Sequence, residues 1–400
     1  MTATAALELR KGALSIFAIT CGVMVANIYL SQPLLAQMAS ALGVTADKAS
    51  LVSVASQIGY ALGILFVVPL ADSANPVKLI RWLMLLTIAG LLGMAVSPGL
   101  AAMLVASASI ALTCVVAQVL IPLVTTFVGP EKRGLVVSKL TGGLILGILL
   151  SRTVSGVAAD YFGSWRSPFI LEIVLIAVLM VVLPRYLPER KSRAGLGYWQ
   201  LLSSLPGLLR HGELRLSMAL SFCTFAGFSA IWATLAFHLA SPAFSLGTAA
   251  AGLFGLWGAP GALLAPYVGR LADRWGSGWV NLISLGSLLL CALMAFFIGD
   301  HSLVALVIAV NLLDFGQQSG QVANQARIFG LEPDIRARLN TLYMAVTFAG
   351  GAMGAWLGAM LWSQGGWSHV CEFVAATTLI ALAVLATSAL IQKARSPVRA

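Results

Sequence analysis

Residues 269–276 read Gly-Arg-Leu-Ala-Asp-Arg-Trp-Gly, and residues 68–73 read Val-Pro-Leu-Ala-Asp-Ser. Both stretches contain Leu-Ala-Asp, and each stands between two long apolar runs, one in either half of the chain. A motif that recurs at a long spacing indicates a chain built from repeated units. We therefore expect an internally duplicated fold.

The composition is that of a membrane protein. Hydrophobic residues make up 59% of the 400 residues and charged residues only 10%, and the mean hydropathy is +0.94, whereas about 25% of a soluble domain is charged. A helix of about 20 apolar residues spans a bilayer core, and the sequence contains twelve such runs. We predict an all-α membrane protein with twelve transmembrane helices.

The twelve runs form two sets of six around one polar, basic segment. This pattern predicts an N-terminal six-helix bundle (1–187), a linker (188–213) and a C-terminal six-helix bundle (214–400). We expect each run to form one continuous helix, among them residues 13–35, 99–127 and 248–268.

The cysteines bear on disulfides and metal binding, and the first apolar run bears on signal-peptide cleavage. All five cysteines lie inside apolar runs and no Cys-x-x-Cys pair occurs, so we interpret them as small packing residues and expect no disulfide and no metal site. The sequence indicates no cofactor. The first run lacks a small-residue cleavage site, which favours a retained helix over a signal peptide.

The basic residues alternate from one loop to the next. Loops 97–99, 241–247, 300–302 and 363–366 contain no Lys or Arg, whereas both termini and the linker are basic. Because Lys and Arg favour the cytoplasmic side, we expect both termini in the cytoplasm. Anionic inner-leaflet lipid then accounts for the net charge of +10. Without a compact basic domain, we expect no binding of nucleic acid.

The second of the two quoted stretches resembles a family signature. It fits the Gly-x-x-x-Asp-Arg-x-Gly motif of the major facilitator superfamily at Gly269, Asp273, Arg274 and Gly276. The first-half copy retains Asp72 but has Val68, Ser73 and Asn75 in place of the first Gly, the Arg and the second Gly. The resemblance implies the major facilitator fold of two pseudo-symmetric bundles. It also implies that Asp72, Gly269, Asp273, Arg274 and Gly276 form a cytoplasmic gating motif.

Within that superfamily the chain resembles the bacterial twelve-helix proton-coupled efflux branch, which includes sugar, purine-nucleoside and drug exporters. The resemblance rests on residues 27–35 (Asn-Ile-Tyr-Leu-Ser-Gln-Pro-Leu-Leu), 57–60 (Gln-Ile-Gly-Tyr) and 314–317 (Asp-Phe-Gly-Gln). Residues 151–156 depart from the branch, because Arg152 stands where its Gly-Pro-x-x-Gly-Gly motif has proline. The resemblance implies export coupled to protons.

Asp314 lies near the middle of the tenth apolar run. A carboxyl group at that depth is costly and usually functional, so we interpret Asp314 as a proton-coupling residue. Asn311, Gln318, Gln321 and Gln325 lie at spacings of three and four around it, which places them on one helical face. That face is either a hydrogen-bonded seam between helices or the wall of a cavity.

Arg152 and Glu172 are the other charged candidates for proton coupling. In an antiparallel pair formed by the fifth and sixth runs, they lie at the same depth. They form an ion pair that stabilises a gate, since pairing lowers the cost of burying each charge, or a site in which Arg152 anchors an anionic substrate, or Arg152 snorkels to the membrane surface.

The remaining candidates are polar and aromatic residues that line a substrate cavity near the midplane, where transporters of this plan bind. They are Asn27, Tyr29, Gln32, Gln57, Tyr60, Gln118, Trp232, His238, Trp257, Asn311, Gln318 and Gln321. His238 is near the end of its run, so it is either a group that titrates near neutral pH or a surface residue.

No paired carboxylates, His cluster or nucleophile with a base occurs at one membrane face, so we expect no catalytic residues and no enzyme. We predict a multi-pass secondary active transporter of the bacterial cytoplasmic (inner) membrane. It exports a small organic solute or drug by proton-coupled alternating access. The alternative is an importer or facilitator of a small organic anion that uses Arg152. The expected partners are the small-molecule substrate, protons and the lipid bilayer, and the family resemblance implies a functional monomer.

Overall fold

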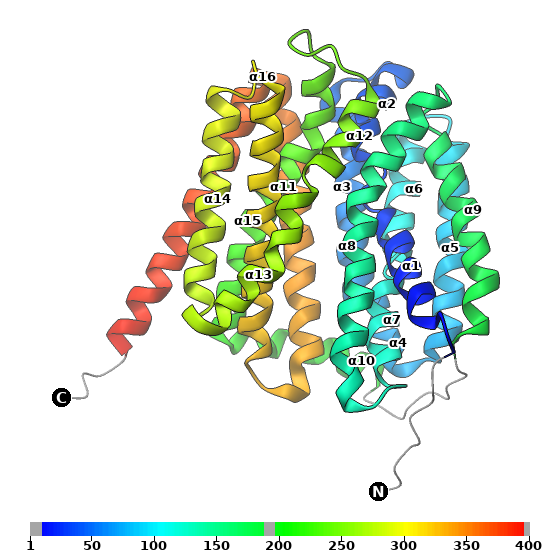
Figure 1. The fold of residues 1–400 in the computed structure, drawn as a ribbon, viewed down its shortest axis with the longest axis vertical. Helices are drawn as coiled ribbons and strands as arrows, with labels where there is room; N and C mark the ends of the chain where they lie inside the picture. The colour runs from blue at the N-terminus through cyan, green and yellow to red at the C-terminus, as the bar shows by residue number, and fades with distance from the viewer. Residues whose placement is uncertain (1–9, 188–196, 396–400) are drawn as a thin grey trace, which may run out of the picture. The chain divides into compact units, whose positions relative to one another are not determined.

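The structure, a computed structural model, describes residues 10–187 and 197–395, which form helices and no strand (Figure 1). In this described part, nine helices are long and apolar enough to cross a membrane, and Ala13–Ala26 and Thr248–Leu264 are shorter apolar helices. The longest helix, α16 (Arg336–Arg395), is two helices joined at Gly365 and Gly366, where the backbone leaves the helical region. These segments agree in number with the twelve apolar runs.

Contacts divide the chain into two compact units. Unit 1 contains Met1–Gly43, Ala55–Leu202 and Thr248–Leu256, and unit 2 contains Val44–Val54, Ser203–Gly247 and Trp257–Ala400. The units follow the two halves of the sequence, except that the beginnings of the second and eighth runs each group with the other half.

Unit 1 is built around α1, which packs along α8 (Figure 1). Its helices are α1 (Ala13–Ala26), α2 (Leu35–Leu42), the C-terminal part of α3 (Ala46–Leu62), α4 (Leu70–Ser73), α5 (Pro76–Ala95), α6 (Leu100–Thr113), α7 (Val116–Thr125), α8 (Pro130–Tyr161), α9 (Ser167–Val182), most of α10 (Tyr198–Ser204) and most of α12 (Thr248–Trp257). Arg10 donates a 3.0 Å hydrogen bond to the carbonyl of Arg185, so the start of the first span and the end of the sixth lie at the same end of this unit.

Unit 2 is built around α11, which packs along α16. Its helices are α11 (Gly212–Ala240), α13 (Ala259–Trp275), α14 (Ser277–Phe297), α15 (Leu303–Phe329) and α16. The side chain of Arg327 lies 3.3 Å from the Glu213 carboxylate, and Gln325 Nε2 donates a 3.3 Å hydrogen bond to Asn340 Oδ1. These contacts bring the start of α11, the end of α15 and the start of α16 to one end of the unit.

Three spans that we expected to be continuous helices are broken, and that expectation is wrong. The first span leaves α1 after Ala26, turns, and resumes with a 3-10 turn (Gln32–Leu34) and α2. The fourth span is divided into α6 and α7, and the eighth into α12 and α13. Pro33 explains part of the first break because it has no backbone N–H to donate. A break exposes backbone groups that must find other partners in an apolar environment.

The two copies of the repeated motif end in different ways. In the first half, Asn75 Oδ1 accepts hydrogen bonds of 3.0 and 3.2 Å from the backbone N–H groups of Val77 and Lys78, and so caps α5. In the second half, Gly276 precedes α14 with φ +84°, a conformation that favours glycine. Asparagine therefore replaces glycine in the first copy where the chain enters its helix through a side-chain cap.

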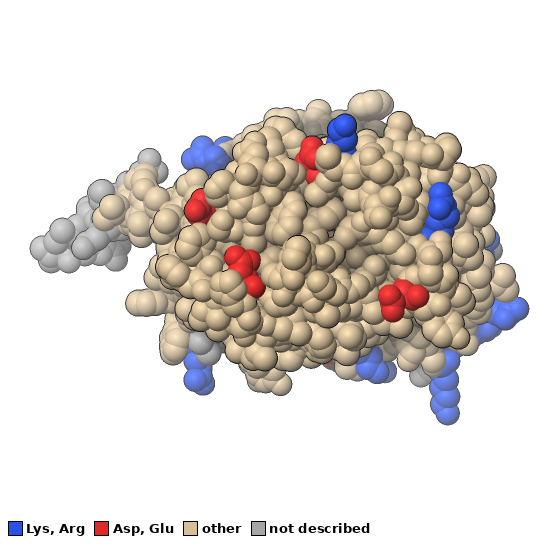
Figure 2. Space-filling view, turned by 90° about the horizontal axis from the view of Figure 1, so that it is seen from above, with Lys and Arg blue, Asp and Glu red and all other residues tan. Residues whose placement is uncertain are grey.

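The side chains of the predicted gating motif are described only in part. Asp72 and Arg274 are exposed. Gly269 and Asp273 lie in the backbone of α13, but their side-chain positions lie outside the described residues. Seen from above, the described part of the surface in Figure 2 is mostly uncharged, with scattered acidic and basic side chains. The gating role of the motif stays a prediction.

Candidate functional site

The turn and 3-10 turn of the first span, residues 27–34, are here called the helix 1 break. Its polar side chains are buried: Asn27, Ser31 and Gln32 are all less than a tenth exposed. Asn27 Nδ2 donates to the carbonyl of Val23 at 2.9 Å, and Ser155 Oγ of α8 donates to the carbonyl of Leu30 at 2.6 Å. Side chains thus bind carbonyl groups that a continuous helix would pair with its own backbone.

Arg152 of α8 reaches the helix 1 break. Its Nε donates a 2.8 Å hydrogen bond to Gln32 Oε1, and its Cζ lies 4.7 Å from the centre of the Tyr29 ring, a cation–π geometry. The side chain is 1% exposed. A Cβ on Gly255 of α12 would lie 2.9 Å from Arg152 Cβ, so glycine permits the close approach of α12. Arg152 is therefore a buried guanidinium that contacts an amide oxygen and an aromatic face.

Glu172 of α9 meets the beginning of the same break. Its Oε1 accepts a 3.3 Å hydrogen bond from Asn27 Nδ2, and the residue is 6% exposed. The helix 1 break thus holds Arg152 through Gln32 and Glu172 through Asn27. Direct pairing of Arg152 with Glu172 stays a prediction.

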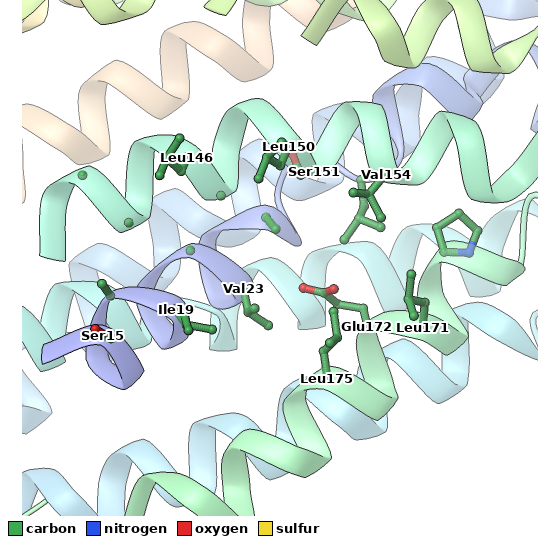
Figure 3. Close-up of a pocket in the computed structure, with 18 of the residues that line it drawn as sticks. Ser15, Ile19, Val23, Leu146, Leu150, Ser151, Val154, Leu171, Glu172 and Leu175 are labelled. Carbon is green, nitrogen blue, oxygen red and sulfur yellow. The ribbon is translucent and has the colours of Figure 1, made fainter. Parts of the chain in front are cut away.

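A groove of about 650 Å³ lies between α1, α8 and α9, here called the α1–α8–α9 groove (Figure 3). Its walls are mostly aliphatic and glycine residues. The polar residues that line it are Ser15, Lys139, Ser151 and Glu172. The Glu172 carboxylate points from α9 toward the space between α1 and α8 (Figure 3). Sequence reasoning missed this groove, because a membrane helix is apolar on faces that contact lipid and on faces that contact protein.

A second polar group in unit 1 joins α3 to α7. Gln57 and Tyr60 are each 1% exposed, and half-buried Gln118 donates a 3.3 Å hydrogen bond from Nε2 to the Tyr60 hydroxyl. Gln57 Oε1 is enclosed without a hydrogen-bond partner among the described residues. A buried amide left in this way costs about 1–3 kcal/mol, and such groups are typical of places that a ligand or water completes.

In unit 2, α15 carries the predicted polar face. Asp314 is 4% exposed, whereas Gln318, Gln321 and Gln325 are only partly buried. Gln317 is not among the candidates predicted from the sequence, yet it is 3% exposed and has both amide atoms enclosed without a hydrogen-bond partner among the described residues. Gln317 lies one residue from the predicted stripe, so spacing alone assigned it to a different face.

Asn311 binds the backbone at the break between α12 and α13. Its Nδ2 donates to the carbonyl of Trp257 at 2.7 Å, and its Oδ1 accepts from the N–H of Gly261 at 3.0 Å. One amide therefore satisfies backbone groups on both sides of the break. Trp257 itself is half-buried.

The aromatic candidates of α11 are buried. Trp232 is 2% exposed and packs against Phe228. His238 is also 2% exposed, so its interpretation as a surface residue is wrong. Its ring stacks on Trp367 with the centroids 4.1 Å apart, and its Nε2 lies 3.3 Å from the carbonyl of Gly299 and 3.6 Å from Asp300 Oδ1. This arrangement ties α11 to the second half of α16 and to the end of α14.

Comparison with known proteins places the chain in a family. The model of the Major Facilitator Superfamily matches residues 14–298 and 214–399. The chain belongs to the major facilitator superfamily. Within the residues that the structure describes, no three His, Cys, Asp or Glu side chains gather as a metal site would require.

Relatives of this superfamily member are named as transporters. It is 40% identical over 378 residues to YgaY of Escherichia coli O157:H7, named an uncharacterized transporter, and the match covers 94% of this chain and 95% of YgaY. It is 33% identical over 366 residues to SCO4007 of Streptomyces coelicolor, named a probable transporter, and the match covers 91% of this chain and 84% of SCO4007. A solved structure of the nucleoside transporter NupG (D323A mutant) shares the fold with a TM-score of 0.77 at 14% identity, covering 94% of this chain and 99% of that one.

The superfamily assignment confirms the expected class. The protein is a multi-pass membrane transporter of a small-molecule substrate and not an enzyme. Three of its described charged residues within the spans, Arg152, Glu172 and Asp314, are buried. Such residues in transporters mark substrate, ion or proton pathways.

Proposed function

We propose that this transporter exports a small organic solute or drug across a bacterial cytoplasmic membrane in exchange for protons. Its N-terminal (1–187) and C-terminal (214–400) bundles alternate access to the substrate, and both termini lie in the cytoplasm. The observation that carries the proposal is a carboxyl group, that of Asp314, buried midway along α15.

The burial of the Asp314 carboxyl group favours its exchange of a proton. An ionised carboxylate within a membrane span is costly, and protonation removes that cost. When the site opens to the outside, Asp314 takes up a proton and the solute leaves. When it opens to the cytoplasm, the proton is released and solute binds. Gln317, one turn further along α15, supplies an amide donor and acceptor whose partners the solute would provide.

Proton movement driven by solute tests this proposal. Liposomes containing the purified protein are made acidic inside and loaded with a pH dye, and candidate solutes are added outside one at a time. Nucleosides are tried first because the structural neighbour NupG is named a nucleoside transporter. Export by antiport predicts that a transported solute lets protons leave, so the internal pH rises faster. Solute uptake with unchanged proton movement would contradict the proposal.

A second candidate is a facilitator of a small organic anion, and the setting of Arg152 favours it. Arg152 is a guanidinium only 1% exposed within a membrane span, beside the helix 1 break. A guanidinium binds carboxylates through charge-assisted, often bidentate, hydrogen bonds. This candidate predicts uptake of organic anions without proton movement, and the loss of that uptake in Arg152→Gln.

A further inference from the structure

The α1–α8–α9 groove faces the bilayer. Ile19 of α1 and Leu146 of α8 line it, and each is 52% exposed. Both belong to apolar helices of a membrane protein, so lipid covers the surface on which they lie. A molecule dissolved in the bilayer therefore reaches this groove without passing through water.

The groove is long enough for one extended alkyl chain. Its lining on α8 extends from Lys139 to Val154, which is about 22 Å at a rise of 1.5 Å per residue. Its volume of about 650 Å³ is within the range of ligand sites, roughly 300–1,000 Å³. Gly143 and Gly147 form part of its floor, where α8 packs against Gly22 of α1. The glycines keep this floor free of side chains.

One end of the groove is acidic. Glu172 lines it, and among the described residues the Asn27 amide is the one hydrogen-bond donor to this carboxylate, on Oε1. A carboxylate accepts up to about four hydrogen bonds, so Glu172 retains acceptor capacity toward the groove. Ser151 adds a hydroxyl to the lining nearby. Lys139, the lining cation, is about 18 Å away from Ser151 along α8.

We infer that the α1–α8–α9 groove binds a single-chain lipophilic amine from the bilayer. The ammonium group lies on Glu172 and Ser151, and the alkyl chain follows the glycine floor toward Lys139. A cation beside Glu172 offsets the cost of a buried carboxylate, and ammonium–carboxylate hydrogen bonds are charge-assisted. Carboxylate amphiphiles are disfavoured in this pose by repulsion from Glu172, and neutral ones gain no pairing of opposite charges there. The binding requires neither a proton gradient nor Asp314, so the inference goes beyond the proposed export.

Native mass spectrometry of the purified protein in detergent tests the inference, with dodecylamine, dodecanol and dodecanoate as probes. Wild type is expected to bind one dodecylamine saturably, and dodecanol and dodecanoate at least tenfold more weakly. Glu172→Gln should weaken amine binding at least tenfold. Asp160→Asn, which removes an exposed carboxylate on α8 outside the groove, should bind as wild type does. Leu150→Trp fills the groove without changing its charge and should also lose the amine.

Two results would overturn the inference. Equal binding of dodecylamine and dodecanol to wild type would show that the groove holds any membrane chain, without recognition of the amine. Unchanged amine binding in both Glu172→Gln and Leu150→Trp would place the amine elsewhere. Solute-driven proton movement is measured separately in liposomes, so the failure of proton-coupled export and the failure of amine binding give different results.

Discussion

Gln32 Oε1 lies 2.8 Å from Arg152 Nε, and this hydrogen bond joins the helix 1 break to α8 at a point where both side chains are 1% exposed. A guanidinium buried among apolar helices is stable only while its donors are met. The irregular backbone of the first span thus positions polar side chains against the two buried charged residues. It brings one amide to Arg152 and another, that of Asn27, to Glu172.

Gln32→Leu should therefore destabilise the protein. The variant leaves Arg152 Nε without its acceptor, a loss of about 1–3 kcal/mol for a buried donor. Gln32→Glu keeps an acceptor and adds a charge opposite the guanidinium, so it should remain closer to wild type. Thermal unfolding in detergent measures both variants. Equal losses in the two would contradict the role given to this hydrogen bond.

The packing of α8 on α1 predicts that alanine at two different glycines of α8 has different effects on stability. A Cβ on Gly147 would collide with the backbone of Gly22, whereas a Cβ on Gly142 would meet nothing within 4 Å. Gly147→Ala should cost about 1–3 kcal/mol through overpacking. Gly142→Ala should be neutral or gain about 0.5–1 kcal/mol from helix propensity. Expression level and thermal unfolding of the two variants would show the difference, and similar behaviour would mean that the helices do not approach as described.

Trp367 provides a test of the aromatic contacts around His238. Trp367 is 3% exposed, stacks on His238 and donates a 3.1 Å hydrogen bond to the carbonyl of Ala295. Trp367→Ala should cost about 3–5 kcal/mol, as for other buried aromatic residues. Trp199 of α10 is 77% exposed, so Trp199→Ala should change stability by less than about 0.5 kcal/mol. A mild effect at Trp367 would argue against the described packing of α16.

The sequence was informative about the spans and less so about their interiors. Twelve apolar runs and the repeated Leu-Ala-Asp motif predicted the fold class, because span length and repetition are one-dimensional features. The helix breaks were not predicted, because they depend on packing in three dimensions and not on the length or repetition of apolar runs. In the fourth span, the break between α6 and α7 at Cys114 and Val115 has neither Gly nor Pro to mark it.

The candidate site shows the same limit. The sequence singled out Asp314, Arg152 and Glu172 because these charged residues lie inside apolar runs. The structure shows that all three side chains are buried. Their contacts were not predictable, because the partners Gln32 and Asn27 are brought into reach only by the helix 1 break. On α15, the spacing of Gln318 and Gln321 suggested one polar face. Gln317 is more buried than either of them. The face of α15 that is turned inward is set by packing against other helices, and the spacing of polar residues does not predict that packing.

The role of Asp314 in proton coupling is the central claim, and a comparison of two variants tests it most directly. Solute-driven proton release is measured in liposomes that are acidic inside, for wild type, Asp314→Asn and Asp160→Asn. Asp160 is an exposed carboxylate of α8 and serves as the matched control. The account predicts that Asp314→Asn abolishes solute-driven proton release while Asp160→Asn retains it. Undiminished proton release in Asp314→Asn would remove Asp314 from the mechanism and contradict the account.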